Sequence, residues 1–236
     1  MKDSLKKIEL DAYYGCQAKI LSILRGLKNG KDLKLLDIGC SDGSLSIKMA
    51  EACGANEVHG LEVEDDAIAK AKKLGIKVHK TDVNGNFPFV EDYFDVVVAS
   101  QIVEHLSNPD NLFIEAARVL KPGGHCIIAT PNLCSLHNRI FMFLGWQITT
   151  IAPSTKVIFG NPGRGAPSNM CGPFRHITAF SPKALREMCE YYGLMVESIS
   201  GSGFHPLGGR LSRFFSSLFP SLSVFIIAKS AKKSLK

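Results

Sequence analysis

An acidic residue and two glycines follow the first strongly apolar stretch of the chain. The segment LLDIGCSDG places Asp37, Gly39, Cys40 and Gly43 in one short turn, and a helical pattern starts directly after it. Glycine permits a tight turn in which a ligand approaches the backbone closely. A carboxylate beside such a turn suits a cationic ligand, for example one with an ammonium and a sulfonium group. A strand-to-helix turn that binds nothing is the alternative.

The spacing of these residues is D-x-G-x-x-x-G. It differs from the G-x-G-x-x-G of turns that hold a pyrophosphate, where three glycines are wanted and no carboxylate lies nearby. The pattern therefore favours a cationic ligand over a dinucleotide.

Two more acidic residues follow the next apolar stretches. Glu62, with Val63 beside it, stands about 20 residues beyond the glycine turn, where an acid can accept hydrogen bonds from both hydroxyls of a ribose. Asp82 could accept a hydrogen bond from an adenine amino group, with Val83 against the ring. Each acid could instead be an ordinary residue at a strand or loop end, but together they indicate a nucleoside cofactor.

A serine, a glutamine and a histidine end the fourth apolar stretch. The segment FDVVVASQIVEHL places Ser100 and Gln101 at the end of the stretch and His105 shortly after it. His105 could face the cofactor or a substrate. A structural histidine whose hydrogen bonds are satisfied inside the protein is the alternative.

The expected elements place these residues along one edge of a sheet. Strand patterns at 33–38, 57–61, 76–79, 94–99 and 126–130 alternate with helical patterns at 44–52, 65–74 and 111–120. This rhythm predicts βαβ units, hence a doubly wound α/β fold with a mostly parallel sheet and helices on both faces. Ligands of such sheets bind outside the carboxyl ends of the strands.

The rhythm fails over 131–175, which is too long for a simple connection. Because this segment contains Trp146 and the run FMFL, we expect a lid or substrate insertion rather than a disordered loop. A helix at 18–27, within an N-terminal extension over 1–30, precedes the sheet. A helix at 182–192 and strands near 195–200 and 222–228 complete a single domain over 1–236.

Composition limits the class of protein and its partners. Apolar residues make up 45% and charged residues 21% of the chain, as in globular proteins with a core of their own. The net charge of +6 lies largely in lysines near the two ends, with no basic stripe between aromatics, so we expect solvated tails and no nucleic-acid partner. The apolar stretch 211–219, with its basic flank, could touch a membrane or a lipid substrate. A helix in the core or a dimer contact is the alternative.

The cysteines and the N-terminus bear on the compartment. Seven cysteines are scattered without a C-x-x-C pair, which argues against a disulfide framework or a zinc site and favours a reducing compartment. The N-terminus lacks an apolar core of signal-peptide length. The apolar stretch 211–228 contains Arg213 and Pro220, so it should not span a bilayer. We therefore expect a cytoplasmic protein.

Five segments, in this order and spacing, resemble the class I S-adenosylmethionine-dependent methyltransferases: LLDIGCSDG, GLEVEDDAIAKAK, KTDVN, FDVVVASQIVEHL and RVLKPGG. The resemblance is strongest over 35–131. Within that superfamily the chain is similar to the small-molecule branch, which includes ubiquinone-biosynthesis and natural-product methyltransferases. It also resembles methyltransferase-like proteins linked to methionine biosynthesis, which share the Pro131-Asn132 and Asn138-Arg139 pairs. The family implies seven strands, the last antiparallel, and S-adenosylmethionine as cofactor.

The resemblance implies roles for the matched positions. The residues that would hold the methionine part of the cofactor are in the glycine turn: Asp37, Gly39, Cys40 and Gly43. The residues that would hold the nucleoside or lie beside the transferred methyl are in the later segments: Glu62, Val63, Asp82, Val83, Ser100 and Gln101.

The sequence departs from the family at two positions. Ser41 stands where glycine is usual, and a small residue should still fit. In the ubiquinone-pathway enzymes the segment E-x-x-E-H is linked to a metal, but here Gln101 replaces its first acid and leaves Glu104 and His105. On ligand count and type we expect no metal.

Methyl transfer is an in-line displacement for which the protein supplies alignment and a dry site. A hydroxyl acceptor needs a general base, for which His105 and His176 are candidates. An amine, thiol or carboxylate needs none, so O-, N- and carboxyl methylation of a small molecule, including a lipid or natural-product intermediate, stay open. Arg139, Arg164 and Arg175 could receive an anionic group of the substrate or be ordinary surface residues.

Two other classes of protein compete with this prediction. A non-catalytic protein with the same fold could bind the cofactor and regulate another enzyme. A nicotinamide-dependent oxidoreductase is disfavoured by Asp37 and by the glycine spacing.

Overall fold

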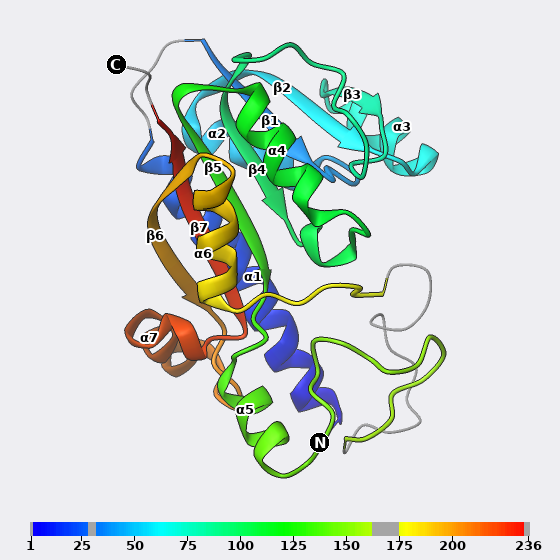
Figure 1. Ribbon diagram of the computed structural model, residues 1–236, viewed down its shortest axis with the longest axis vertical. Coiled ribbons are helices and arrows are strands. Elements are labelled where there is room, and N and C mark those ends of the chain that lie inside the picture. The colour runs from blue at the N-terminus through cyan, green and yellow to red at the C-terminus, as the bar shows by residue number, and fades with distance from the viewer. Residues whose placement is uncertain (1, 28–31, 162–174, 234–236) are drawn as a thin grey trace.

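The computed structural model describes residues 2–27, 32–161 and 175–233. Its centre is a seven-stranded sheet in the order β3-β2-β1-β4-β5-β7-β6 (Figure 1). The strands are β1 (Leu33–Ile38), β2 (Ala55–Glu62), β3 (Lys77–Lys80), β4 (Phe94–Ser100), β5 (Leu120–Pro131), β6 (Leu194–Ser202) and β7 (Phe225–Lys232). Neighbouring strands pair in parallel except β7, which is antiparallel to both β5 and β6. The predicted doubly wound, mostly parallel seven-stranded sheet is confirmed.

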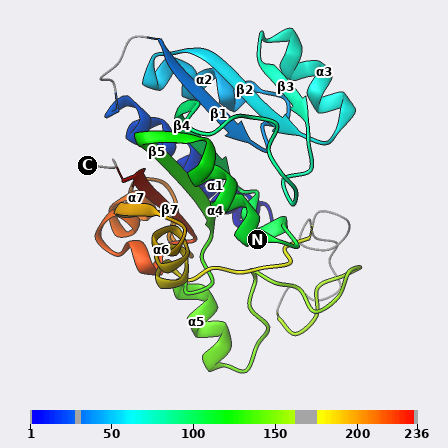
Figure 2. The same ribbon diagram turned by 45° about the horizontal axis from the view of Figure 1, so that its top comes forward.

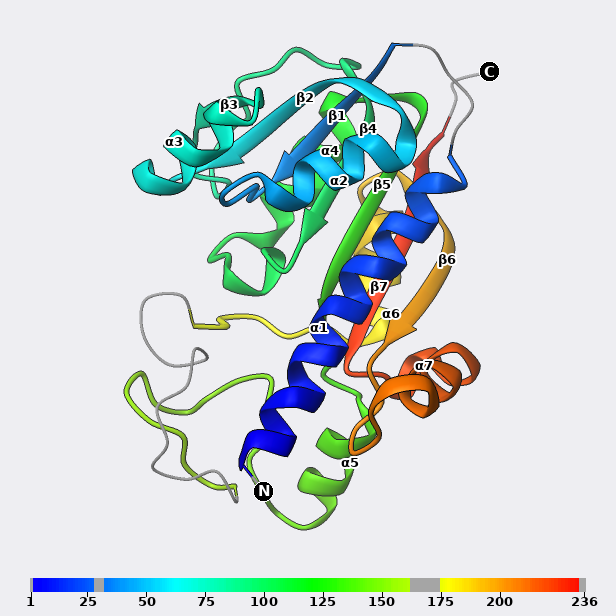
Figure 3. The ribbon, with the colours of Figure 1, turned by 180° about the vertical axis from the view of Figure 1, so that it is seen from behind.

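Helices cover both faces of this sheet (Figures 1 and 3). The helices are α1 (Lys2–Arg25), α2 (Ser44–Cys53), α3 (Asp65–Lys73), α4 (Pro109–Val119), α5 (Leu136–Phe143), α6 (Pro182–Tyr191) and α7 (Gly209–Leu218). Two short 3-10 turns, η1 (Val103–His105) and η2 (Pro220–Leu222), follow β4 and α7.

Alternating side chains of the central strands feed two cores. In β4, Val97 and Ala99 pack into a core shared with α4 and α6, whereas Val96 and Val98 pack into a core shared with α1 and α2. Successive side chains of a strand point to opposite faces, so a strand covered on both sides is apolar throughout. This explains the uninterrupted valines of β4.

The prediction for the N-terminal helix, 18–27, is wrong about where the helix begins, because α1 starts at Lys2. Its buried side chains recur every four residues at Ala12, Cys16, Ile20 and Leu24. Alanine and cysteine are small, so the early part of this stripe gives little hydrophobic signal among its charged neighbours. The helix nevertheless packs along α2 and the sheet.

Two later strands also differ from their predicted bounds. β5 begins at Leu120 rather than 126, because the chain re-enters the sheet with a register shift opposite Phe94 and Val96. β7 covers Phe225–Lys232 rather than 222–228, because Pro220 opens the turn η2 before it. Both strands occur in the expected order, so the topology is unaffected.

The insertion predicted over 131–175 contains α5, which stands away from the sheet (Figure 2). Residues 162–174, and Arg164 with them, lie outside the described residues. The expectation that the insertion closes over the site therefore stays a prediction.

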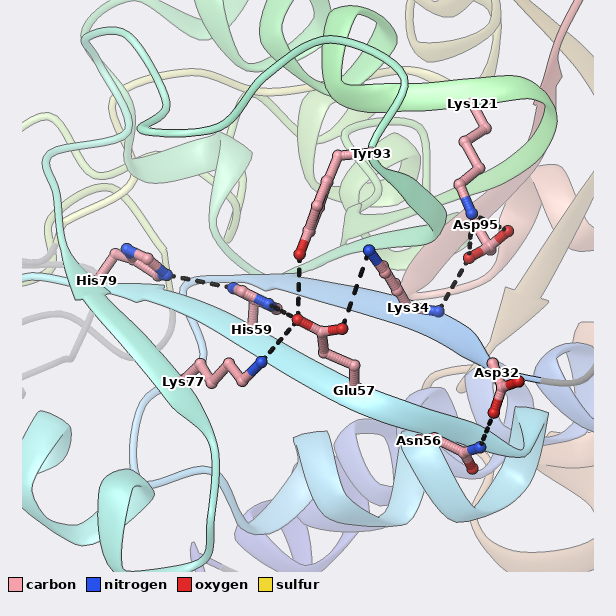
Figure 4. A network of polar contacts seen from close by, with 10 residues as sticks. All are labelled: Asp32, Lys34, Asn56, Glu57, His59, Lys77, His79, Tyr93, Asp95 and Lys121. Carbon is pink, nitrogen blue, oxygen red and sulfur yellow. Dashed lines mark hydrogen bonds and ion pairs between the residues drawn. The ribbon is translucent and has the colours of Figure 1, made fainter.

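A polar network around the amino-terminal half of β2 contains residues of β1, β2, β3, β4 and β5 (Figure 4). Glu57 Oε1 lies 2.8 Å from His59 Nε2 and 2.7 Å from Lys77 Nζ. The hydrogen bond from His59 is the largest cause that lowers the pKa of Glu57 to about 2. A carboxylate only accepts, so His59 donates from Nε2, and its Nδ1 lies 3.2 Å from His79 Nε2. These contacts hold β2 to β3.

Two further expectations can be compared with the described residues. No helix among them is long and apolar enough to cross a membrane. The six cysteines within them take part in no disulfide there, and Cys171 lies outside them.

Candidate active site

The glycine turn connects β1 to α2 through three left-handed residues. Gly39, Ser41 and Gly43 have φ values of 77°, 48° and 80°. A Cβ on Gly43 would collide with Ile76 Cδ1 and lie 3.0 Å from Ala71 Cβ, so this position requires glycine for both space and conformation. The N–H groups of Gly39 and Cys40 both bond to the carbonyl of Leu61, at 2.9 and 3.1 Å. The turn is thereby fixed to the end of β2.

Glu62, at the carboxyl end of β2, is held facing this turn. Its Oε2 accepts the Ser41 N–H at 2.9 Å. Its Oε1 accepts the N–H groups of Val63 at 2.7 Å and Glu64 at 3.1 Å. The structure therefore brings together the two segments that the sequence predicted to bind the cofactor.

Asp37 and Cys40 are buried behind the turn. Asp37 Oδ2 accepts the Ser46 hydroxyl at 2.6 Å. Burial, opposed by that bond and assisted by the charge of Glu62, raises the pKa of Asp37 to about 6. Burial likewise raises the pKa of Cys40 to about 12, so its thiol is protonated and packs as an apolar group. The side chain of Asp37 thus braces the turn against α2.

The adenine candidates lie beyond β3 with different degrees of exposure. Asp82 is exposed, and its Oδ1 accepts the backbone and side-chain N–H groups of Asn84, both at 2.9 Å. Val83 is 7% exposed and belongs to the core shared with α4 and α6. At most an edge of Val83 can meet a ring, so Asp82 is the more accessible of the pair.

The end of β4 holds a strained residue with an unsatisfied group. Gln101 has φ 57°, a left-handed conformation unusual for this residue type, and its N–H bonds to Ala129 at 2.8 Å. Its side-chain Nε2 is buried and has no hydrogen-bond partner among the described residues. Strain and an unpaired buried donor are both typical of ligand-binding positions. Ser100, directly before it, is half-buried.

The two candidate histidines lie side by side, although they are far apart in the sequence. The rings of His105 and His176 are 4.9 Å apart, edge to face. His105 Nδ1 lies 3.2 Å from the carbonyl oxygen of Arg175, and His176 Nδ1 lies 2.8 Å from that of Thr150. A carbonyl only accepts, so each ring donates from Nδ1, and Nε2 is the proton-accepting atom of each neutral ring.

The surroundings of His176 change the pKa of its ring. Burial lowers the pKa of His176, opposed by the bond to Thr150 and assisted by the neighbouring His105. His176 is therefore a neutral base at physiological pH.

Glu104 completes this group, although the sequence analysis did not assign it a catalytic role. It is 2% exposed, and its Oε2 accepts the Thr130 hydroxyl at 3.0 Å. Within the part of the chain that the structure describes, its Oε1 has no hydrogen-bond partner. Oε1 lies 4.0 Å from His105 Nε2. Burial raises the pKa of Glu104 to about 7. An acid beside a histidine in an otherwise apolar segment was the available sequence signal.

The insertion positions His176 through two buried asparagines. Asn138 accepts the Thr149 N–H at 3.0 Å and donates to the carbonyls of Asn132 and Leu133. It thereby fixes the backbone at Thr149. The next residue, Thr150, accepts the hydrogen bond from His176 Nδ1 at its carbonyl oxygen. Asn132 donates to the carbonyls of Ser221 and Ser223, which anchors the insertion to the turn before β7. The asparagines of the Pro131-Asn132 and Asn138-Arg139 pairs thus anchor the insertion to the rest of the domain.

The returning chain is fixed to η1 by backbone bonds. The N–H groups of Ile177 and Thr178 bond to the carbonyl of Glu104 at 2.7 and 3.1 Å. Arg139 donates from Nε to the carbonyl of Cys134, at 2.8 Å, and Arg175 is exposed. Neither arginine forms an ion pair with an acid of the described residues.

The predicted absence of a metal can be compared with this geometry. Glu104, His105 and His176 each offer one ligand atom, and these atoms lie within 4.8 Å of one another. The group is therefore compact enough to surround a cation.

Comparisons with known proteins agree with this arrangement. A family model described as a methyltransferase domain matches residues 10–199. A ubiquinone biosynthesis O-methyltransferase from Hydrogenovibrio crunogenus is 24% identical over 194 residues, which cover 79% of this chain and 72% of that protein. The mitochondrial ubiquinone biosynthesis O-methyltransferase of Rattus norvegicus is 29% identical over 187 residues, which are 75% of this chain but only 48% of that protein.

Solved structures share the fold at low sequence identity. A Haloferax volcanii putative methyltransferase, solved in complex with the Trm112 methyltransferase activator, superimposes with a TM-score of 0.66 at 14% identity, covering 99% of this chain and 95% of that one. An S-adenosylmethionine-dependent methyltransferase from Mesorhizobium loti gives 0.61 at 17% identity, covering 92% and 98%. Taken with the match to the family model, these findings show that the chain belongs to the methyltransferase domain family and is a class I S-adenosylmethionine-dependent methyltransferase.

Proposed function

We propose that this chain methylates a hydroxyl oxygen of a small molecule. The observation that carries the proposal is the pair of histidines, His105 and His176, each of which donates from Nδ1 to a carbonyl and has Nε2 as its basic atom. A hydroxyl must lose its proton as its oxygen attacks, whereas a neutral amine or a carboxylate attacks without such help. A paired base would serve no purpose for those acceptors.

The residues at the carboxyl edge of the sheet fit the cofactor. S-adenosylmethionine supplies an electrophilic methyl group on a sulfonium centre. The buried, unpartnered amide of Gln101 offers a donor, and the turn from Gly39 to Gly43 offers a backbone that a ligand can approach. Asp37, behind the turn, contributes negative potential toward the cationic methionine part.

Glu62 is the residue proposed to recognise the ribose. A carboxylate has about four acceptor positions, and three are used by the N–H groups of Ser41, Val63 and Glu64. One ribose hydroxyl can bind without any change. A second can bind when the Ser41 N–H is released, which couples the glycine turn to cofactor binding.

In the proposed reaction His176 holds the proton of the acceptor hydroxyl at Nε2. The carbonyl of Thr150 fixes the ring and its tautomer. The resulting imidazolium would lie beside His105 and Glu104, whose Oε1 is 4.0 Å from His105 Nε2. The carboxylate of Glu104 can stabilise positive charge on either ring, the role that an acid plays behind a catalytic histidine.

The test is turnover with a panel of acceptors, measured as formation of S-adenosylhomocysteine. We expect catechol and phenol hydroxyls to be methylated in preference to amines and carboxylates. His176→Asn retains a donor near the position of Nδ1 but lacks Nε2, so kcat should fall by roughly 10²- to 10⁴-fold. His125→Asn, a half-buried histidine on β5, is the control.

Two results would contradict the proposal. An amine acceptor that outperforms every hydroxyl would exclude O-methylation as the main activity. A His176→Asn and His105→Asn pair with unchanged kcat would exclude the base. The alternative of a non-catalytic partner protein predicts cofactor binding without turnover of any acceptor.

A further inference from the structure

Exposed apolar side chains gather at one end of the molecule. Among the described residues, 20 large hydrophobic side chains are exposed. Of these, 12 lie in the first part of α1, in α5 and α7, or within three residues after these two helices, at the lower end of the molecule in Figures 1 and 3. Such a concentration on a folded domain marks an interaction surface.

The helix α7 has its apolar and polar faces reversed relative to an ordinary surface helix. Its buried residues are Ser212 and Ser216, while Leu211, Phe214 and Leu218 are 61%, 62% and 57% exposed. The Ser212 hydroxyl accepts the N–H of Phe204 at 2.8 Å, so the inward face is held by hydrogen bonds. The predicted alternative of a helix that packs its apolar residues in the core is wrong for these three side chains. Their spacing puts them along one side of the helix.

The helix α5 shows the same reversal. Its one buried residue is Asn138, while Ile140 and Phe143 are 48% and 90% exposed. Leu144 and Trp146, directly after the helix, are also exposed. The rings of His137 in α5 and His205, shortly before α7, lie 4.9 Å apart. The amino-terminal ends of the two helices therefore lie near one another, and we call the exposed apolar side chains of both the α5–α7 surface.

The two helices of this surface carry basic residues and no acidic ones. The acidic residues are concentrated in the first half of the sequence. Residues 1–115 contain 14 basic and 19 acidic residues, whereas residues 116–236 contain 14 basic and 3 acidic ones. No Asp or Glu occurs in 116–186 or 198–236. Arg139, Arg210 and Arg213 are exposed on or beside the two helices. Of the acids at the start of α1, Asp11 is bonded to the N–H of Gly209 at the beginning of α7.

We infer that the α5–α7 surface docks on an anionic lipid bilayer. Helices with aromatic and aliphatic residues on one side and flanking arginines lie in the headgroup region of such membranes. Each cation near an anionic surface contributes about 1 kcal/mol. The exposed side chains of the two helices can enter a bilayer directly, whereas a protein partner would need a groove that matches them. A second copy of the chain would bring an equally cationic face against this one.

Trp146 makes the inference directly measurable, because it is the only tryptophan of the chain and is 42% exposed beside α5. The probes are vesicles of phosphatidylcholine with and without phosphatidylglycerol. We expect the protein to co-sediment with the mixed vesicles and its fluorescence to shift to the blue. Loss of two or three cation contacts in pure phosphatidylcholine should reduce binding by at least roughly tenfold. High salt should have a similar effect.

The variant Phe143→Glu/Phe214→Glu should abolish both signals, while Tyr191→Glu, an 83% exposed aromatic on α6, should leave them unchanged. Equal melting temperatures establish that the variants fold. Absence of co-sedimentation and of the blue shift with mixed vesicles would overturn the inference. So would equal binding to both vesicle types, or a dimer in solution that Phe143→Glu/Phe214→Glu dissociates. None of these readouts depends on methyltransferase activity.

Discussion

The buried carboxyl of Glu104 should make the stability of the protein depend on pH in a defined direction. Burial raises the pKa of Glu104 from its ordinary value of 4.5 to about 7. Between these values the folded state keeps a proton that the unfolded chain has lost. Its contribution to stability is therefore present at low pH and is lost as the pH rises through about 7.

The size of this effect follows from the two pKa values. The interval from 4.5 to about 7 corresponds to about 3 kcal/mol of folding free energy once both states are ionised, at about 1.4 kcal/mol per pKa unit. At pH 5 only about 1 kcal/mol of this has been lost, and at pH 8 nearly all of it. The difference between the two conditions is about 2 kcal/mol.

The substitution Glu104→Gln removes the titration and keeps an oxygen for the Thr130 hydroxyl. The difference in unfolding free energy between the variant and the wild type should be about 2 kcal/mol more favourable to the variant at pH 8 than at pH 5. For a chain of this size, this corresponds to roughly 4–8 °C in melting temperature. Urea denaturation of both proteins at the two pH values, in the presence of a chelator, measures it. Glu115→Gln is the control, because Arg118 lowers the pKa of that buried acid. A difference between Glu104→Gln and wild type that is the same at both pH values would refute the reasoning.

Two further predictions concern the glycine turn and the histidine group. Gly43→Ala should destabilise the protein by about 2 kcal/mol or more, because its left-handed conformation and the close backbone of Ala71, whose Cα would lie 3.1 Å from a Cβ, both oppose the change. Gly54 has the same left-handed conformation, but a Cβ on it would meet nothing within 4 Å, so Gly54→Ala is the control. Thermal melts of both variants measure the cost of the contacts around Gly43. Equal losses of stability in the two variants would show that these contacts cost nothing. Extensive dialysis against EDTA should leave methyl transfer unchanged. A loss of activity that a divalent ion restores would instead assign Glu104, His105 and His176 as metal ligands.

Much of the fold was predictable because the patterns that specify it are local. The consecutive valines of β4 identify a buried strand, and the glycines at 39 and 43 identify the turn between a strand and a helix. Ala12 and Cys16 of α1 could not be recognised in this way, because small residues carry little hydrophobic signal until Ile20 and Leu24 show which face is buried.

The sequence predicted the positions of the site residues on the sheet, and it named His176 as a candidate base without indicating how that residue reaches the site. Glu62 ends β2 and Gln101 directly follows β4, and parallel strands bring such positions to a common edge. His176 reaches the site through the insertion, by way of the Asn138 and Thr150 contacts, and no spacing in the sequence encodes that path. Glu104 was missed because its importance comes from burial, which a sequence does not show directly.

Calorimetric titration with S-adenosylhomocysteine, with NAD as the comparison, tests the central claim most directly. We predict micromolar binding of the first ligand and none of the second. Glu62→Ala should weaken binding by roughly 10- to 100-fold, since hydrogen bonds to a charged group contribute about 1.5–3 kcal/mol. Glu64→Ala, an exposed neighbour, should not. Binding of NAD alone, or unchanged affinity in a folded Glu62→Ala protein, would contradict the account.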